Sequence, residues 1–271
     1  MGLEQRILGA AGALFLAAAA GFAQEKPCAA ETQELLRRTK EVRLAMFGGF
    51  HSKRDPQTGE IIKKDDVGNE YFISLLGDLK RGGYTAIGLE IPYAAKPAID
   101  IYTRYLETGH GIPDPRYGEL IPSLPYAKDD SLLPIIEAAA SHHLEVVPIA
   151  GKEFVDKSVE HSDYDKFMRQ REHEITSIIS EYLHAHPDGK MAVFIGAKHI
   201  TKRPIHLLYV WDFQSQEGGT VRDPQYPSFA YAAAALSKQH RVLSVDLSGG
   251  MLRQNERDVL VDFTVSPACL R

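Results

Sequence analysis

The sequence predicts an α/β protein, a single domain with a mainly parallel central sheet flanked by helices. Apolar runs of strand length alternate with longer segments of helical periodicity, which is typical of a parallel sheet covered by helices. Two of these runs are followed by a short motif that contains glycine and histidine. In open α/β sheets, ligands bind beyond the carboxyl ends of the strands. We therefore expect the functional site at that edge of the sheet.

Each expected element follows from its local pattern. The helix that begins near residue 69 carries Leu75, Leu76 and Leu79 at helical spacing and ends at Gly82-Gly83. The longest expected helix stops before Pro187. Its apolar side carries Phe167, Ile175, Ile178, Ile179, Tyr182 and Leu183. The expected strands are 42–48, 85–90, 144–149, 191–196, 206–211 and 241–246, with a possible edge strand at 258–264. The expected helices are 30–40, 69–81, 96–107, 130–142, 162–186 and 227–238.

Residues 1–23 predict a signal peptide. Arg6 precedes an apolar run over 7–20, and small residues at 21–23 suit cleavage. The run is shorter than the roughly 20 residues that a membrane span requires. We therefore expect an exported protein, periplasmic or extracellular, with no stable membrane span after cleavage; an uncleaved anchor is the alternative. Residues 24–271 are then one α/β domain.

Composition narrows the class of partner and cofactor. The net charge is −5 and the chain has no basic run, which argues against nucleic-acid binding. Cys28 and Cys269 lie near the two ends of the mature chain, where an exported protein can form a disulfide. No Cys-x-x-Cys motif occurs, so a thiolate metal site is excluded. A small-molecule or peptide substrate remains, and the pattern does not indicate an oligomeric state.

Two Gly-x-x-His motifs end strands: Gly48-Gly49-Phe50-His51 and Gly196-Ala197-Lys198-His199. With 22 Gly and 11 His in 271 residues, about one such string arises by chance. The evidence that these two motifs are functional therefore comes from their position at the ends of strands. Glycine at a strand end lets the backbone turn sharply and places the histidine at the edge of the sheet. Two imidazoles there suit a metal, a proton-transfer site or a bound ligand.

Two charged residues complete the candidate set. Glu90 ends an apolar run, and a carboxylate there is costly if buried without a partner, so it is either solvated or paired at a site. Arg171, early in the long helix, either lies on a solvated face with Glu/Arg pairs or holds a substrate carboxylate or an oxyanion. The chain has no Gly-x-Ser-x-Gly elbow and no phosphate-binding glycine loop. Water activated by His, Glu or a metal is therefore the expected nucleophile.

In this order, the motifs resemble those of the erythromycin esterase, haem-uptake lipoprotein (ChaN-like) and Tiki protease superfamily. The similarity covers roughly residues 42–247. The matching pieces are Phe47-Gly48-Gly49-Phe50-His51, Gly88-Leu89-Glu90-Ile91-Pro92, Arg171-Glu172-His173-Glu174-Ile175 and Phe194-Ile195-Gly196-Ala197-Lys198-His199. The resemblance implies a pocket at the sheet edge built from His51, Glu90, Arg171 and His199. It also implies that His51, Glu90 and His199 activate water or hold a divalent metal.

The resemblance leaves three functions open. The first is an exported hydrolase, an esterase or peptidase, that acts on an ester or amide. The second is a protein that binds haem or another ligand without catalysis, with Tyr93, Tyr117 and Tyr126 as candidate anchors. The third is a protein that keeps the fold and has lost the chemistry. Its basis is Gly49, which stands where the family pattern Gly-Glu-x-His has Glu.

Overall fold

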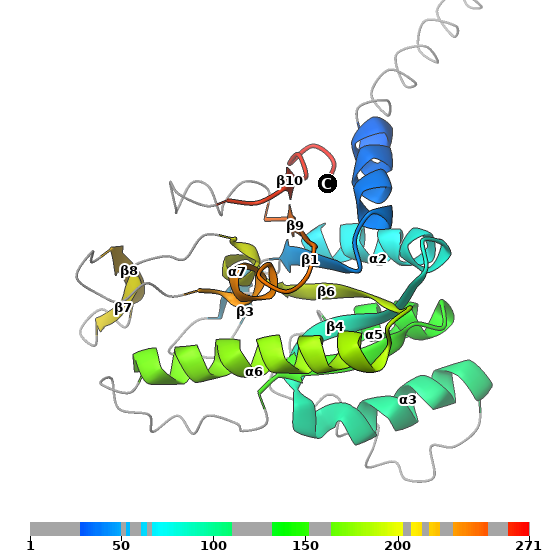
Figure 1. The fold of residues 1–271 in the computed structure, drawn as a ribbon, viewed down its shortest axis with the longest axis horizontal. Coiled ribbons are helices and arrows are strands. Elements are labelled where there is room, and N and C mark those ends of the chain that lie inside the picture. The colour runs from blue at the N-terminus through cyan, green and yellow to red at the C-terminus, as the bar shows by residue number, and fades with distance from the viewer. Residues whose placement is uncertain are drawn as a thin grey trace, which may run out of the picture.

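The structure of this chain is a computed structural model (Figure 1). It describes residues 28–49, 53–54, 61–63, 67–109, 132–151, 164–202, 207–212, 217–222, 230–248 and 260–270. The predicted signal peptide at 1–23 and the candidate residues His51, Tyr117 and Tyr126 lie outside these ranges.

In the described part of the chain, six strands form one sheet in the order β10-β9-β1-β6-β4-β5. Every neighbouring pair in it is parallel. The α/β class and the mainly parallel sheet are therefore confirmed. The strands are β1 (Leu44–Gly49), β4 (Tyr84–Pro92), β5 (Glu145–Ala150), β6 (Lys190–Gly196), β9 (Val242–Asp246) and β10 (Phe263–Thr264).

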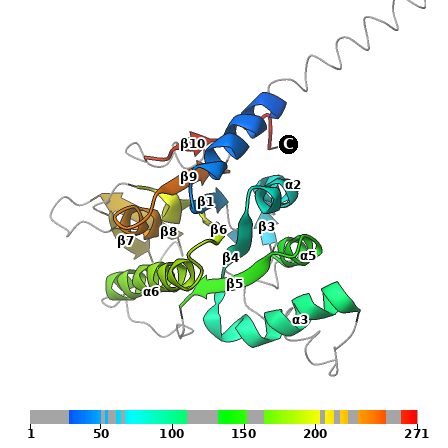
Figure 2. The same cartoon turned by 45° about the vertical axis from the view of Figure 1, so that its right-hand side comes forward.

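Helices cover both faces of the sheet (Figure 2). They are the helix at residues 28–40, α2 (Val67–Arg81), α3 (Lys96–Thr108), α5 (Leu133–Ser141), α6 (Tyr164–Ala185) and α7 (Ala232–Leu236). The 3₁₀ turns η1 (Tyr93–Ala95) and η4 (Ala197–Ile200) directly follow β4 and β6. Side-chain alternation along the strands divides the core in two, because successive residues of a strand point to opposite faces. Ala45 and Phe47 of β1 pack with α2 and α5, whereas Leu44 and Met46 pack with α6 and α7.

The chain leaves β1 and β6 toward opposite faces of the sheet. The helix after β1, α2, lies on one face, and η4 and α7 after β6 lie on the other. Because β1 and β6 are neighbours, the two connections diverge at the carboxyl ends of these strands, where Gly49 and Gly196 are paired. Such a switch point opens a crevice in which α/β proteins bind ligands. The sheet thus places a candidate site beside β6.

Two strand pairs lie outside the central sheet. β7 (Leu207–Asp212) and β8 (Glu217–Arg222) pair antiparallel with each other, and so do β2 (Lys53–Arg54) and β3 (Ile61–Lys63). The apolar run at 206–211 does form a strand, but its expected place in the parallel sheet is wrong. The physical reason is that a short apolar run specifies an extended backbone and not the partner with which it pairs. β2, β3 and β8 were not expected from the sequence.

The helix at residues 28–40 is linked covalently to the end of the chain. Cys28 and Cys269 form a disulfide with their Cα atoms 5.3 Å apart, across a sequence separation of 241. Buried Leu35 joins the helix to the core. The sequence allowed this disulfide, and the structure contains it.

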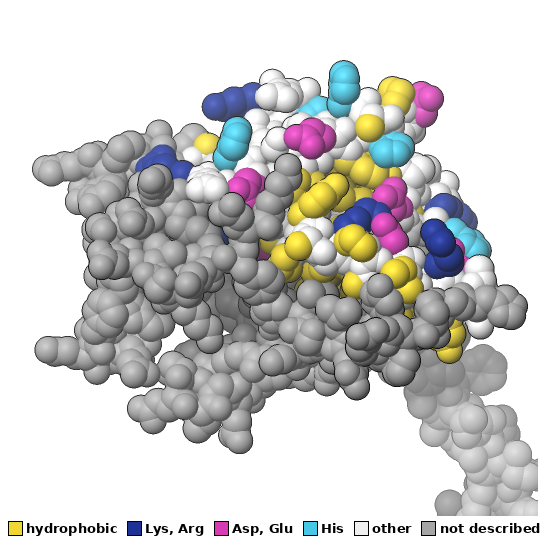
Figure 3. Space-filling model, turned by 90° about the horizontal axis from the view of Figure 1, so that it is seen from below, with side chains coloured by type: hydrophobic (Ala, Val, Ile, Leu, Met, Phe, Trp, Pro, Cys, Tyr) yellow, Lys and Arg dark blue, Asp and Glu magenta, His cyan; other side chains and the backbone are white. Residues whose placement is uncertain are grey.

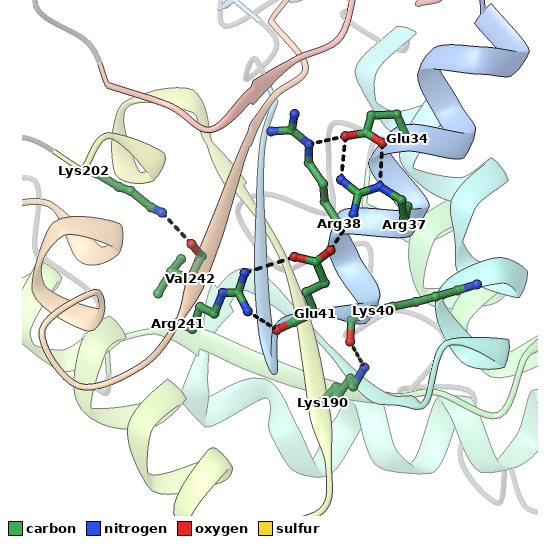
Figure 4. Close-up of polar contacts among 9 residues, drawn as sticks. All are labelled: Glu34, Arg37, Arg38, Lys40, Glu41, Lys190, Lys202, Arg241 and Val242. Carbon is green, nitrogen blue, oxygen red and sulfur yellow. Dashed lines mark hydrogen bonds and ion pairs between the residues drawn. The ribbon is translucent and has the colours of Figure 1, made fainter.

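Exposed polar contacts surround the carboxyl end of the same helix (Figure 4). Glu34 pairs with Arg37 and Arg38, and Glu41 pairs with Arg241 at 3.0 Å, just before β9. Surface pairs of this kind each contribute less than about 1 kcal/mol. The disulfide and the buried leucine therefore hold this helix more firmly than the charges do.

No helix in the described ranges combines the length and the apolar character that crossing a bilayer requires. Apolar side chains do gather in the middle of the described part of one face, with charged side chains around them (Figure 3). Among the described residues, the large hydrophobic side chains that remain exposed are Tyr93, Tyr105, Leu106 and Leu260.

Candidate functional site

Glu90 lies near the carboxyl end of β4, within a stretch where the register with β5 shifts between Leu89 and Pro92. Such irregularities redirect side chains beside functional sites. Only 3% of the side chain is exposed. Oε2 accepts a hydrogen bond from the backbone N–H of Gly196 at 3.1 Å, and Oε1 pairs with Nη2 of Arg171. Of the two alternatives for Glu90, the structure therefore has the paired carboxylate.

Arg171 reaches this carboxylate from α6. Its side chain is 18% exposed, so the guanidinium is partly shielded from water. Burial lowers the pKa of Arg171 from its ordinary value, and the nearby Glu172 carboxylate acts in the opposite direction. A guanidinium nevertheless stays protonated in proteins and has five N–H donors in a planar fork. Among the described residues, Glu90 takes one of these nitrogens, so the guanidinium has further N–H groups with which to hold an anion.

His199 completes the described cluster from η4, the 3₁₀ turn that begins directly after Gly196 at the end of β6. The residue is 6% exposed. Its Nε2 lies 3.7 Å from Oε1 of Glu90, and its Nδ1 pairs with Oε1 of Glu172. The ring of Tyr231 meets the imidazole edge-on, with the centroids 5.8 Å apart. The imidazole thus lies between two carboxylates that come from different elements.

Glu172 is a member of this cluster that sequence reasoning missed. Its side chain is 3% exposed, and its second oxygen, Oε2, accepts the backbone N–H of Ala232 at 2.8 Å. A signal was present in the sequence. Glu172 precedes Ile175 by three residues and Ile179 by seven, so it lies on the buried stripe of α6. A carboxylate on a buried stripe requires a partner from outside the helix.

The structure thus brings together three of the four predicted site residues, Glu90, Arg171 and His199, and adds Glu172. His51 lies outside the described residues, so its role stays a prediction. Tyr93, one of the three candidate anchors, is 40% exposed on η1 directly after β4.

Gly49, at the end of β1, has no room for a side chain. A Cβ atom there would lie 2.5 Å from Cζ of Phe194, which stands on the neighbouring strand β6. The Phe194 ring is 6% exposed and packs against the Phe72 ring at a centroid distance of 5.0 Å. The ring therefore fills the space that a glutamate at position 49 would need. The packing of Phe194 thus requires glycine at position 49, where the Gly-Glu-x-His pattern has glutamate.

We expect Gly49→Ala to lower the free energy of unfolding by about 1–3 kcal/mol, because overpacking a well-filled core costs this much. The same change in a Phe194→Ala background should cost clearly less, since the ring that blocks the methyl group is gone. Chemical denaturation of the four proteins in this double-mutant cycle measures the coupling. Strictly additive effects would show that the Phe194 ring does not exclude a side chain at position 49.

The described donors do not fit a divalent metal ion. Among the described residues, no group of three or more His, Cys, Asp or Glu side chains is arranged to hold one. Oε1 of Glu90, the oxygen that faces His199, already pairs with a guanidinium. A second cation on this oxygen would be repelled by the first. A metal held by His51, Glu90 and His199 stays a prediction.

No protein-family model and no curated protein matches the sequence. Solved structures of bacterial effectors and toxins match parts of this chain at low identity. The type III effector HopBA1 has 14% identity and a TM-score of 0.44 over 63% of this chain and 74% of the effector. The RRSP effector domain of a MARTX toxin from Vibrio vulnificus has 18% identity and a TM-score of 0.41 over 72% of this chain and 38% of that one. The C-terminal region of Pasteurella multocida toxin has 12% identity and a TM-score of 0.45 over 72% and 27%.

This chain therefore spans well under half the length of the RRSP and Pasteurella multocida toxin structures. All three TM-scores lie below 0.5.

Proposed function

We propose that the protein is an exported hydrolase that cleaves an ester or amide bond at a His/Glu/Arg site, with water activated by histidine. The observation that carries the proposal is the meeting of Glu90, Arg171 and His199 at one edge of the sheet. These residues come from β4, α6 and η4, and they lie far apart in the sequence. A buried carboxylate with a guanidinium and an imidazole beside the same oxygen provides the groups that general acid–base and oxyanion chemistry require.

Each group has a role that its contacts support. Glu90 has both oxygens engaged, by the Gly196 N–H and by Arg171, so it holds the guanidinium in place and is a poor proton acceptor. His199 is the base. Its Nε2 takes a proton from water while the water oxygen bonds to the acyl carbon, and the carbonyl electron pair moves onto oxygen beside Arg171. When the tetrahedral intermediate collapses, the bond to the leaving alkoxide or amine breaks, and that group takes the proton from His199. His51 is the proposed fourth member of the site.

The exposed fractions suggest the side from which a substrate arrives. The side chains of Glu90, Glu172 and His199 are at most 8% exposed, whereas that of Arg171 is 18% exposed. A small-molecule or peptide substrate would thus meet the guanidinium first. Export is part of the proposal, and the Cys28–Cys269 disulfide supports it, because disulfides persist in oxidising compartments.

His199→Ala is expected to reduce hydrolysis about 10²- to 10⁴-fold, the range that general acid–base catalysis contributes. The measurement is kcat/KM on a panel of p-nitrophenyl esters and one p-nitroanilide amide, with purified protein. His184→Ala, an exposed histidine in the last turn of α6, is the matched control and should leave the rates unchanged. Equal rates for wild type and His199→Ala would remove His199 from the mechanism.

The second candidate is a binding protein that holds haem or another ligand without catalysis. The filled space beside Gly49 favours it, because a glutamate of the family pattern is both missing and excluded. Titration of the same purified protein with haem separates the two candidates. A sharp Soret shift together with no hydrolysis on any substrate of the panel would support the binding protein. Hydrolysis that depends on His199 would support the enzyme.

A further inference from the structure

The imidazole of His199 makes different contacts through its two nitrogens. Nδ1 pairs directly with Oε1 of Glu172, whereas Nε2 is 3.7 Å from Oε1 of Glu90, beyond hydrogen-bond distance. Oε1 of Glu90 is moreover occupied by Arg171. Of the two flanking carboxylates, Glu172 is therefore the one whose oxygen lies close enough to the ring to accept a hydrogen bond from its N–H.

Glu172 is itself held in a fixed position. Its Oε2 accepts the N–H of Ala232 at 2.8 Å, which leaves Oε1 directed at the imidazole. The preceding residue, Tyr231, is 5% exposed, and its ring stands at 83° to the plane of the His199 ring. Tyr231, just before α7, thus contacts His199 through its ring, and Ala232, the first residue of α7, contacts Glu172 through its backbone N–H. The orientation of the pair is set by three elements, α6, η4 and the segment that enters α7.

We propose that Glu172 is a positioning residue that fixes the tautomer of His199, with the proton on Nδ1 and the lone pair of Nε2 free to accept a proton from water. The tautomer of a histidine is set by the hydrogen bond that its other nitrogen makes. A carboxylate on Nδ1 also stabilises the imidazolium that forms when Nε2 takes up the proton, as in carboxylate–histidine pairs of hydrolases. This inference rests on the proposed function for its catalytic meaning, but the tautomer itself can be observed without any substrate.

The test is long-range ¹H–¹⁵N correlation NMR on the full mature chain labelled with ¹⁵N-histidine. The His199 signals are identified by their loss in His199→Gln, and spectra are recorded at a pH where the ring is neutral. In wild type we expect protonation at Nδ1. In Glu172→Ala we expect a shift of the signals toward the Nε2-protonated form. In Glu172→Gln the carbonyl oxygen serves the Ala232 N–H and the amide NH2 then faces Nδ1, so we expect a shift toward the Nε2-protonated form there as well. Glu181→Ala, an exposed position on the same helix, is the control and should change nothing.

The effect of Glu172 on catalysis is measured in a separate kinetic experiment. We expect Glu172→Ala and Glu172→Gln each to lower kcat on the ester panel by about 10²-fold or more while KM changes little. A wild-type ring protonated at Nε2, or a tautomer that is unchanged in Glu172→Ala, would overturn the inference. Nδ1 protonation that depends on Glu172 in a protein without hydrolysis would support the inference and contradict the proposed function. The two failures are therefore distinguishable, and Glu172→Gln covers the case in which Glu172→Ala does not fold.

Discussion

Replacing Cys28 and Cys269 together by serine is expected to lower the free energy of unfolding by about 5 kcal/mol. In the chain-entropy description, a disulfide stabilises by restricting the unfolded chain, and the effect grows slowly with the length of the closed loop. This disulfide spans a sequence separation of 241, so nearly the whole described chain lies within the loop. A loss of this size is comparable with the entire stability of many domains.

The measurement is denaturant unfolding of wild type and of the double serine variant. A matched control keeps the disulfide and removes a neighbouring contact. Glu31 accepts the backbone N–H of Ser266 at 2.5 Å beside the disulfide, and Glu31→Ala should cost about 1 kcal/mol or a little more. If the double serine variant is as stable as Glu31→Ala, the disulfide contributes little beyond the local contacts of the helix at residues 28–40.

The fold could be predicted from the sequence where a local pattern decides the outcome. The alternation of apolar runs and helical segments indicated the parallel sheet, and β1, β4, β5, β6 and β9 lie close to the expected ranges. Strand partnership could not be predicted in the same way. The apolar run at 207–212 predicts a strand whether it lies in the central sheet or in a separate hairpin. Its pairing with residues 217–222 shows that it lies in a separate hairpin. The partner strand follows after only four residues, but its sequence Glu-Gly-Gly-Thr-Val-Arg has no apolar alternation, so the local pattern does not mark it as a strand.

The same distinction between features that a local pattern predicts and features that it does not applies to the site. Glu90 and His199 could be found because each stands where a strand ends, a position that by itself suggests an edge of the sheet. Glu172 was missed because the Arg and Glu residues around it fit a solvated face with Glu/Arg pairs as well as a site, and only Arg171 was taken as a candidate. Residues that are adjacent along a helix do not face each other, so Arg171 and Glu172 cannot satisfy one another and each finds a partner elsewhere. The block that Phe194 places on position 49 needed coordinates, because it is a contact across two strands.

We expect Glu90→Leu to be the most destabilising single change in the site, with a loss of about 3–5 kcal/mol. The replacement leaves the guanidinium of Arg171 largely buried without its carboxylate, and breaking a buried pair from one side costs this much. The double variant Glu90→Leu/Arg171→Leu should recover most of the loss, because replacing both members of a buried pair by apolar side chains is often neutral.

Chemical denaturation of the four proteins in this cycle gives the coupling energy between the two residues. Asp78→Ala is the comparison for an exposed pair. Asp78 and Arg81 form a salt bridge on α2 with side chains 42% and 73% exposed, so we expect a loss of at most about 1 kcal/mol. If Glu90→Leu costs no more than Asp78→Ala, Arg171 is solvated in solution and the buried pair at the site is contradicted.

The double variant also separates stability from chemistry. It should fold, because neither charge is left alone, and yet it should hydrolyse no ester, because the anion-binding guanidinium is absent. If the double variant is both stable and active, the pair serves only the packing between β4 and α6, and the reaction has to be assigned to other groups at the edge of the sheet. If it is stable and inactive, Glu90 and Arg171 are kept for function at a site where apolar residues would hold the fold equally well.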